Sequence, residues 1–341
     1  VGGAGRGGDP ATSFAVAFRT TESAVKVAEA ELSLDRWKRL SSDARRFGDQ
    51  EAHLLGLAQV FWASAMVGDV SGAGGLIEEY ARSAEPLRQP RWDYWLNLMR
   101  SFQAALEADL QGAERYLQTA EQLGEGFGWA REGLYGISMF LLRRDQGRLS
   151  EVAPVVRAMS RMESQNAMWR PGLAALQLEL GQHDEALTAY EEVTSNGPGA
   201  SGEASPELAL ALTAEVSAAL GDSDGAAALI NRLRPCRGRF LAFLGCSAGL
   251  GPADRLLGML ASTAGRAEDA ERWHRSSVEL ARQMRSPLWI AHCLHDYGVH
   301  QVRFGMTEGL GLLEEASAVC AEFSLPGLGA RVERSLESTL L

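Results

Sequence analysis

Leu180-Gly181-Gln182-His183-Asp184-Glu185-Ala186 is the stretch of sequence that decides the fold. It separates two amphipathic runs, and its glycine is followed five residues later by a small residue. The pattern Gly-x-x-x-x-(Ala/Leu/Val) recurs along the chain, with Ala108 in the glycine position of one copy, and the copies begin at residues 68, 108, 147, 181, 221, 265 and 305. A period of roughly 34–44 residues is typical of stacked helix pairs. The sequence therefore predicts an all-α superhelix of about seven helical hairpins plus capping helices.

Each copy of the repeat has a physical explanation. We expect Gly181 to end one helix at positive φ, Asp184 to cap the next helix, and Ala186 to let the two helices approach closely. The residue twelve positions before this small residue should face it, and in five copies it is small: Ser101, Ala174, Ala214, Gly258 and Gly298. Phe61 and Phe140 stand there in the other two copies, so we expect those hairpins to be splayed.

The same period predicts where the elements lie. Residues 1–20 are glycine-rich and are expected to be a flexible segment, whereas residues 21–341 are expected to form a single helical repeat domain. Thr21 to Phe47 is predicted to form one or two helices. The hairpins are expected near 50–84, 90–124, 129–163, 166–195, 205–234, 251–284 and 287–323, followed by a short helix near 327–340. Pro154 and Pro171 fall inside hairpins, where a first helical turn is expected. No segment predicts a β-strand.

Composition excludes several functional classes. No run approaches the roughly 20 apolar residues of a membrane span, and a formal charge of -11 disfavours direct nucleic-acid binding. The four cysteines have no CxxC spacing, so we expect reduced, structural thiols in a cytoplasmic protein. The chain begins at Val1 without a secretory signal, and we interpret it as part of a longer protein. A GxGxxG match at residues 3–8 follows no strand, there is no P-loop, and no cofactor is predicted.

Residues 235–249 form an unusually long apolar, glycine-punctuated connection. Its phenylalanine and leucine content predicts that it packs on the array, and whether it lines the groove is left open. Four arginines surround it, and they fit either solvated charges at a helix end or a site for an anionic ligand or acidic domain: Arg232, Arg234, Arg237 and Arg239.

One cluster resembles a metal site. His292, Asp296 and His300 share a helix face at four-residue steps, and imidazoles with a carboxylate suit zinc or iron. No HExxH order and no second cluster complete such a site, so a polar helix face is the favoured interpretation and no metal is predicted.

Aromatic residues concentrate on the first helix of several hairpins, which lines the concave surface in arrays of this type. Tryptophan is also ordinary filling between helices, and we expect only one or two to face the groove. The candidate groove comprises these aromatic residues and neighbouring polar ones: Trp62, Trp92, Trp95, Asn97, Arg100, Trp129, Arg131, Trp169, Arg170, Arg237, Arg239, Trp289 and His292.

Three segments carry a family resemblance: 139–149, 169–174 running into 180–186, and 250–258 running into 264–270. The third is the most specific, because Leu250-Gly251-Pro252 is not part of the generic repeat. Together they resemble the tetratricopeptide-type C-terminal region of STAND-class bacterial signalling ATPases, which include large ATP-binding LuxR-type regulators and multidomain adenylate/guanylate cyclases. The resemblance implies a sensor array that clamps an attached nucleotide-binding module until an effector or partner releases it. It supplies no catalytic residue.

We therefore expect a non-enzymatic sensor or protein-interaction domain of a bacterial signal-transduction or transcription regulator. Its expected partners are its own or a separate nucleotide-binding ATPase module and a small-molecule or peptide effector, with neither nucleic acid nor membrane. The alternative from another class is a freestanding tetratricopeptide scaffold. A helical enzyme that uses the face of His292, Asp296 and His300 is the third hypothesis.

Overall fold

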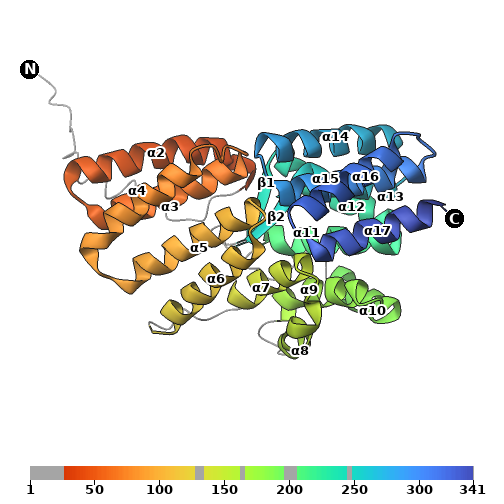
Figure 1. Ribbon diagram of the computed structural model, residues 1–341, viewed down its shortest axis with the longest axis horizontal. Helices are drawn as coiled ribbons and strands as arrows, with labels where there is room; N and C mark the ends of the chain where they lie inside the picture. Colours follow the sequence, from red (N-terminus) through yellow and green to blue (C-terminus); the bar gives the residue numbers. More distant parts are fainter. Residues whose placement is uncertain (1–26, 127–133, 162–165, 196–205, 244–247, 341) are drawn as a thin grey trace, which may run out of the picture.

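The computed structural model describes residues 27–126, 134–161, 166–195, 206–243 and 248–340, and shows an α-α superhelix (Figure 1). A 3₁₀ turn (η1, Val27–Glu29) and α2 (Ala30–Phe47) come first. The predicted hairpins follow as α3–α4 (Gln50–Met66, Ala73–Ala84), α5–α6 (Pro90–Leu106, Leu110–Glu125), α7–α8 (Leu134–Asp145, Leu149–Ser160), α9–α10 (Asn166–Glu179, His183–Ser195), α11–α12 (Pro206–Leu220, Ser223–Leu233), α13–α14 (Ala253–Thr263, Ala267–Gln283) and α15–α16 (Pro287–Arg303, Gly309–Glu322). Helix α17 (Pro326–Leu340) closes the array, and the predicted all-α class is confirmed. The predicted flexible segment at residues 1–20 lies outside the described residues.

The repeated turn has the predicted backbone. The first residue of every copy has positive φ, including Ala108 at 63° and Gly181 at 73°. The residue directly after it closes the turn, as where Gln182 N–H donates to the Gln177 carbonyl at 2.8 Å in a Schellman-type bond. Asp184, the predicted cap, instead lies inside the first turn of α10. Capping falls one residue after the glycine position, where Asp109 accepts from Gly112 N–H at 2.8 Å.

Packing within the hairpins follows the predicted small residues only in part. Ser101 Oγ donates to the Ala113 carbonyl at 2.9 Å across the tight α5–α6 pair. Within the hairpins that contain Phe61 and Phe140, the two helices contact each other less extensively than α5 and α6 do, as predicted. The helices of the α11–α12 hairpin are also loosely packed, although α11 carries Ala214. Helices α2 and α3 form a tight pair that the repeat did not predict. A Cβ added to Gly56 would lie 2.7 Å from the Cβ of Ser41, so the pair depends on that glycine.

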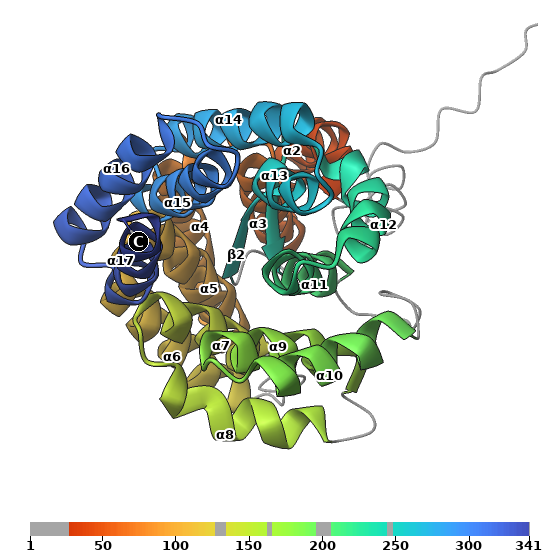
Figure 2. The same ribbon diagram turned by 90° about the vertical axis from the view of Figure 1, so that its right-hand side faces the viewer.

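The prediction that no segment forms a strand is wrong. Strands β1 (Phe240–Phe243) and β2 (Ala248–Pro252) pair antiparallel, with Phe240 opposite Pro252 and a bulge between Leu241 and Ala242. Four-residue apolar runs are too short to show period-two alternation, and every residue of β1 is buried. The hairpin lies inside the superhelix (Figure 2), where it contacts α3, α5, α7 and α11. The long connection therefore packs on the array as predicted.

Two prolines depart from the expected positions. Pro154 and Pro171 lie within α8 and α9, past the first turn. Each removes a backbone N–H from the helix, and such a proline costs roughly 3 kcal/mol in an isolated helix. Packing of these helices against their neighbours must offset that cost, because α8 and α9 remain continuous through the prolines.

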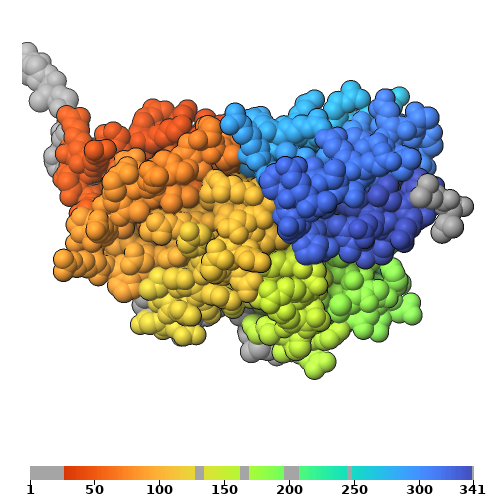
Figure 3. Space-filling model, in the orientation of Figure 1, coloured from red at the N-terminus to blue at the C-terminus, as the bar shows by residue number. Residues whose placement is uncertain are grey.

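The superhelix coils until its later turns touch its earlier ones. Helix α17 contacts α7, and α15 contacts α5. Ser286 Oγ donates to the Leu106 carbonyl at 2.7 Å, and one apolar cluster combines Phe61, Phe102 and Trp289 with Leu328. Figure 3 shows α5–α6 (yellow) and α15–α17 (blue) in direct contact at the surface. Early and late turns of the superhelix consequently border the same interior. Within the described residues, no helix combines the length and the apolar character that a membrane span needs.

Candidate ligand-binding cleft

A cleft of about 700 Å³ opens on the inner side of the C-terminal half of the superhelix. Its walls come mainly from the first helices of successive hairpins, α7, α9, α11, α13 and α15, and from α17, which Figure 2 shows around the centre of the molecule, while α10 and α14 contribute one histidine each. We call it the inner cleft. It is lined by Arg144, Ala175, Leu178, Glu179, Leu180, Gly181, His183, Glu215, Val216, Ala218, Ala219, Arg255, Met259, Ser262, Thr263, His274, His295, Asp296, Val299, His300, Arg303, Arg331 and Arg334.

Buried charges from four helices form the floor of the inner cleft. Arg144 donates to Glu215 Oε2 at 2.7 Å, and Arg255 donates to Glu215 and to Asp296 Oδ2, the latter at 2.7 Å. His295 Nδ1 lies 2.8 Å from Asp296 Oδ1, and its Nε2 lies 3.0 Å from the hydroxyl of a serine on α17. We call these five residues the ionic network. It connects α7, α11, α13 and α15, so it fixes the relative positions of the helices that line the cleft.

The two carboxylates of the ionic network are held ionised. Burial by itself raises the pKa of Glu215, but Arg144 and Arg255 outweigh burial and hold that pKa at about 2. Burial likewise opposes ionisation of Asp296, yet the Arg255 guanidinium and His295 keep its pKa well below the usual range. Because charged partners surround each carboxylate, neither is available as a general acid near neutral pH.

The mouth of the inner cleft carries additional positive charge. Arg303, at the end of α15, and Arg334, on α17, are exposed and make no ion pair with any described residue. Arg331 lies 3.6 Å from Glu179 Oε1, its partner across the α9–α17 contact. Five arginines therefore face three carboxylates in the lining, although the chain as a whole has a formal charge of -11.

A histidine pair forms another side of the inner cleft. His274 is fully buried, and neither of its ring nitrogens has a hydrogen-bond partner among the described residues. Its ring lies against Gly258, where an added Cβ would come within 2.8 Å of it, and 5.2 Å from the ring of His300. Burial lowers the pKa of His274 to about 3. The imidazole is therefore neutral, with one N–H donor and one acceptor nitrogen.

Ser262 and His300 resemble part of a hydrolase triad but lack its geometry. Ser262 Oγ donates to the Gly258 carbonyl at 2.9 Å, so at 2.7 Å it accepts from His300 Nδ1–H instead of giving up its proton. His300 Nε2 lies 3.9 Å from Glu271 Oε2, beyond hydrogen-bond length. Both residues lie in helices, whose backbone N–H groups are already bonded, so no oxyanion hole faces the serine. The arrangement suits binding better than nucleophilic catalysis.

A second hollow, of about 640 Å³, lies between α2, α3 and α4 and is lined by Arg45, His53, Glu79 and Arg82 among others. Its two arginines each have an acidic partner, because Arg45 lies 3.4 Å from Glu79 and Arg82 lies 3.7 Å from Glu78. Its lining is mostly polar, so it lacks the apolar walls of the inner cleft.

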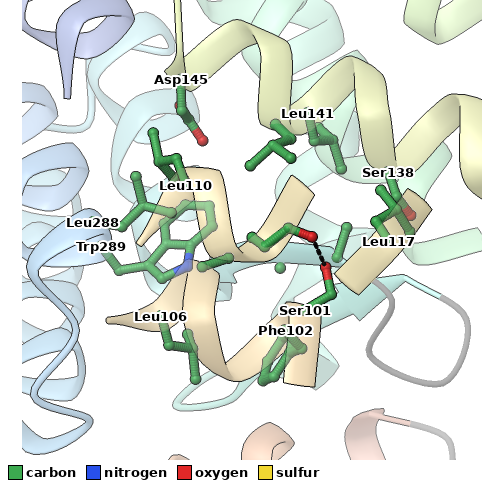
Figure 4. A pocket seen from close by; sticks show the side chains of 15 residues that line it. Ser101, Phe102, Leu106, Leu110, Leu117, Ser138, Leu141, Asp145, Leu288 and Trp289 are labelled. Carbon is green, nitrogen blue, oxygen red and sulfur yellow. Dashed lines mark hydrogen bonds between the residues drawn. The ribbon is translucent and has the colours of Figure 1, made fainter. Parts of the chain in front are cut away.

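The predicted groove residues lie elsewhere, and none of the described ones lines the inner cleft. Trp92, Trp169 and Trp289 are buried in the core, in agreement with the alternative that tryptophan fills space between helices. Trp62 and Trp95 are half-buried, with ring centroids 5.3 Å apart. Trp289 borders a cavity of only about 40 Å³ between α5, α6, α7 and β2 (Figure 4), room for water but not for a ligand.

The polar members of that predicted groove have local partners. Asn97 donates to the Asp93 carbonyl one turn earlier, and Arg100 stacks on Tyr116. Arg170 lies 3.6 Å from Glu192. Trp129 and Arg131 lie outside the described residues.

The arginines of the long connection face the N-terminal helices. Arg239 pairs with Glu31 of α2 at 2.6 Å, and Arg237 is exposed. Neither reaches the inner cleft. Among the cysteines, Cys236, Cys293 and Cys320 form no disulfide with any described residue, and Cys246 lies outside the described part of the chain.

The three residues of the supposed metal face have separate partners. His292 Nε2 bonds Asp145 Oδ1 at 2.9 Å, Asp296 belongs to the ionic network, and His300 bonds Ser262. No group of three or more His, Cys, Asp or Glu side chains in the described residues is arranged to hold a metal ion. The shared helix face therefore ties α15 to α7 and α13.

Sequence reasoning singled out Asp296 and His300 as part of a polar helix face, but it missed the arginines and Glu215 that form the inner cleft with them. Arg144 follows the apolar run of α7, Glu215 interrupts the apolar run of α11, and Arg255 precedes the apolar run of α13, and these charges beside apolar runs were the available signal. Charged residues are almost never fully buried unless paired, so charges inside apolar stretches indicate a buried polar network. Their partners lie 40 to 71 residues away in the chain, and the repeat alone does not specify which helices meet.

No protein-family model matches the chain, and no curated protein matches it significantly.

Proposed function

We propose that the chain is a non-enzymatic sensor domain that binds an effector in the inner cleft and thereby controls a nucleotide-binding ATPase module, attached or separate. The observation that carries the proposal is the inner cleft itself: about 700 Å³, within the range of small-molecule sites. The ATPase partner and the regulatory setting rest on the resemblance of three sequence segments to STAND-class regions. A cytoplasmic location belongs to the same proposal.

The position of the inner cleft supports switching. A ligand in the inner cleft can touch α7, α9, α11, α13, α15 and α17. Two of these helices, α7 and α17, form the contact between early and late turns of the superhelix, so the ligand can affect that contact. A ligand shifts a conformational equilibrium only by as much as its affinity differs between the two states. The lining is spread over several hairpins, so a change in the curvature of the superhelix changes the shape of the inner cleft. The affinity for the ligand then differs between the two conformations, as switching requires.

The second candidate is a freestanding scaffold that joins two proteins. The exposed apolar side chains Leu32 and Val155, on the outer helices α2 and α8, favour it locally, but single exposed apolar residues are common on soluble proteins. A concave cleft of about 700 Å³ has no evident purpose in a scaffold, so the sensor is the better supported function.

The test combines binding with regulation. Calorimetry of the 341-residue chain against metabolite and peptide libraries should reveal a ligand whose binding is lost in Ala219→Trp, which places a large side chain at an exposed cleft position. The same ligand should change the ATPase rate of the nucleotide-binding module when the chain is present. A ligand that binds outside the cleft, or a module whose rate never responds to the chain, would refute the proposal.

A further inference from the structure

We infer that the effector of the inner cleft is a small organic oxyanion: an apolar body that bears a carboxylate or phosphate group. This inference rests on the proposed function and specifies its ligand. It is carried by the charge of the lining, the apolar surface beside that charge, and an unsatisfied buried side chain.

The charge of the lining is unevenly distributed between floor and mouth. Glu215 and Asp296 are fully engaged by Arg144 and Arg255 at the floor, at distances of 2.7 Å where the bonds are of ordinary length. The floor is therefore electrically satisfied. The cationic excess remains at the mouth, on Arg303 and Arg334 with Arg331 beside them.

Guanidinium groups at such a mouth select oxyanions. Their planar forks match carboxylate and phosphate, and Arg331 and Arg334 lie one helical turn apart on α17. The lining carries more arginines than carboxylates, and a concave site with an excess of one sign of charge focuses the field on an approaching ion. An acidic protein that gathers an excess of positive charge at one concave site thereby directs anions to that site.

The walls provide apolar contact for the rest of the ligand. Leu180 and Val299 line the cleft and are 39% and 40% exposed, which leaves their side chains uncovered in the free protein. Leu178 and Met259 extend the same surface. A ligand that consisted only of an inorganic ion would leave this surface wet, so we expect an organic anion.

His274 provides the independent observation. It lines the inner cleft, is 0% exposed, and makes no hydrogen bond with any described residue through either ring nitrogen. A buried donor without an acceptor is costly, and native proteins seldom retain one without a reason. The neutral imidazole therefore keeps an unused N–H donor beside the cleft, and because the ring is fully covered in the free protein, a ligand oxygen or a water reaches it only when neighbouring side chains move aside.

Three probes with one apolar body test the inference: 2-naphthyl phosphate, 2-naphthoate and neutral 2-naphthol. In calorimetric titrations of the 341-residue chain, at least one anionic probe should bind about tenfold or more tightly than 2-naphthol, a ratio expected for one charge-assisted contact. Raising the salt concentration should weaken only the anionic probes. The preferred anionic probe then decides between phosphate and carboxylate.

Variants locate the binding. Arg303→Gln with Arg334→Gln should weaken the anionic probes about tenfold or more and leave 2-naphthol unchanged. Arg36→Gln is the matched control, because Arg36 is an exposed arginine on α2, away from the cleft. Ala219→Trp should abolish binding of every probe, and because Ala219 is exposed, this variant is expected to fold.

Several results would overturn the inference. They are equal affinity for 2-naphthol and both anions, no binding of either anion at millimolar concentration, or anion binding unchanged by the double arginine variant. An acidic peptide that displaces the probes and binds more tightly would also overturn it in favour of a protein ligand. Anion binding in the cleft without any effect on the ATPase module would leave this inference standing and remove the proposed function, whereas regulation by a neutral effector would do the reverse.

Discussion

The two halves of the superhelix interior are built from the same kind of helix but are filled differently. In the N-terminal half, the space between α5, α6 and α7 is closed by the β1–β2 hairpin and aromatic side chains, and about 40 Å³ remains (Figure 4). In the C-terminal half, the first helices carry arginines and carboxylates instead, and about 700 Å³ remains open.

The difference teaches that the repeat determines the path of the chain, while the residues facing inward decide what the interior becomes. Phe102, Phe240 and Trp289 pack edge to face in the closed half, with ring centroids 5.5 to 6.0 Å apart. Paired charges such as Arg255 and Asp296 cannot pack in this way, because each needs its polar partners satisfied. Charge therefore keeps the second half hollow.

The strongest test of the comparison removes an aromatic ring from the closed half. Phe240 is 0% exposed, and Phe240→Ala should lower the free energy of unfolding by about 3–5 kcal/mol, because it loses apolar burial and leaves a cavity. Denaturant titration measures the loss. Phe47→Ala, at a 40% exposed position of α2, should cost less than about 1 kcal/mol. Equal losses in the two variants would show that the hairpin is not part of the core.

Breaking the ionic network should cost somewhat less. Arg255→Met leaves Glu215 and Asp296 without their shared cation, and losing one partner of a buried pair costs about 3–5 kcal/mol. We expect about 3 kcal/mol, the lower end of that range, because the Glu215 side chain is 16% exposed and water can partly solvate it. Adding Asp296→Asn to the variant should recover part of the loss, because Glu215 still has Arg144 as its partner. If the double variant is less stable than Arg255→Met alone, uncompensated charge on Asp296 is not the cause.

Acid should weaken the open half first. The pKa of His274 is about 3 in the folded chain and about 6.5 when unfolded, so below pH 6.5 the unfolded chain takes up a proton that the folded chain does not. Stability is therefore full above pH 6.5 and falls as the pH drops towards 3, by about 2 kcal/mol at pH 5 from this group.

Equilibrium unfolding of His274→Leu should show a smaller slope of stability against pH than the parent chain. His183→Gln, at an exposed cleft position, is the control and should keep the parent slope. Hydrogen exchange at pH 5 should rise in α13–α15 before α3–α6. Uniform exchange across both halves would contradict the assignment of acid sensitivity to the open half.

Sequence reasoning predicted the path of the chain well because the path depends on local signals. Positive φ at Gly181 and its equivalents, and helix limits within a few residues of those expected, follow from turn chemistry and period. The β1–β2 hairpin escaped because its strands are short and buried, and Asp184 was assigned a capping role that its position in α10 excludes.

The site was not predictable in the same way. Trp92, Trp169 and Trp289 were chosen as groove candidates for their chemistry, but their helices turn them into the core. Which residues face inward depends on how the superhelix closes, as in the contact of α17 with α7 and the bond between Asp145 and His292. The Asp145–His292 bond joins residues 147 positions apart, the α7–α17 contact joins still more distant segments, and no local pattern encodes either one.

The smallest effect concerns the turns, which should behave alike in both halves whatever the interior contains. Ala108 has φ of 63° in the closed half, and Gly181 has φ of 73° in the open half with nothing near its missing Cβ. A residue with a Cβ costs roughly 1–2 kcal/mol in this conformation.

Ala108→Gly should thus stabilise the chain by about 1 kcal/mol or less, since part of the gain is lost to unfolded-state entropy and to the loss of the buried methyl group. Gly181→Ala should destabilise it by about 1 kcal/mol. Thermal and denaturant unfolding of both variants measure the pair. Shifts of the same sign would mean that the turns are not equivalent, and that the two halves differ in backbone as well as in content.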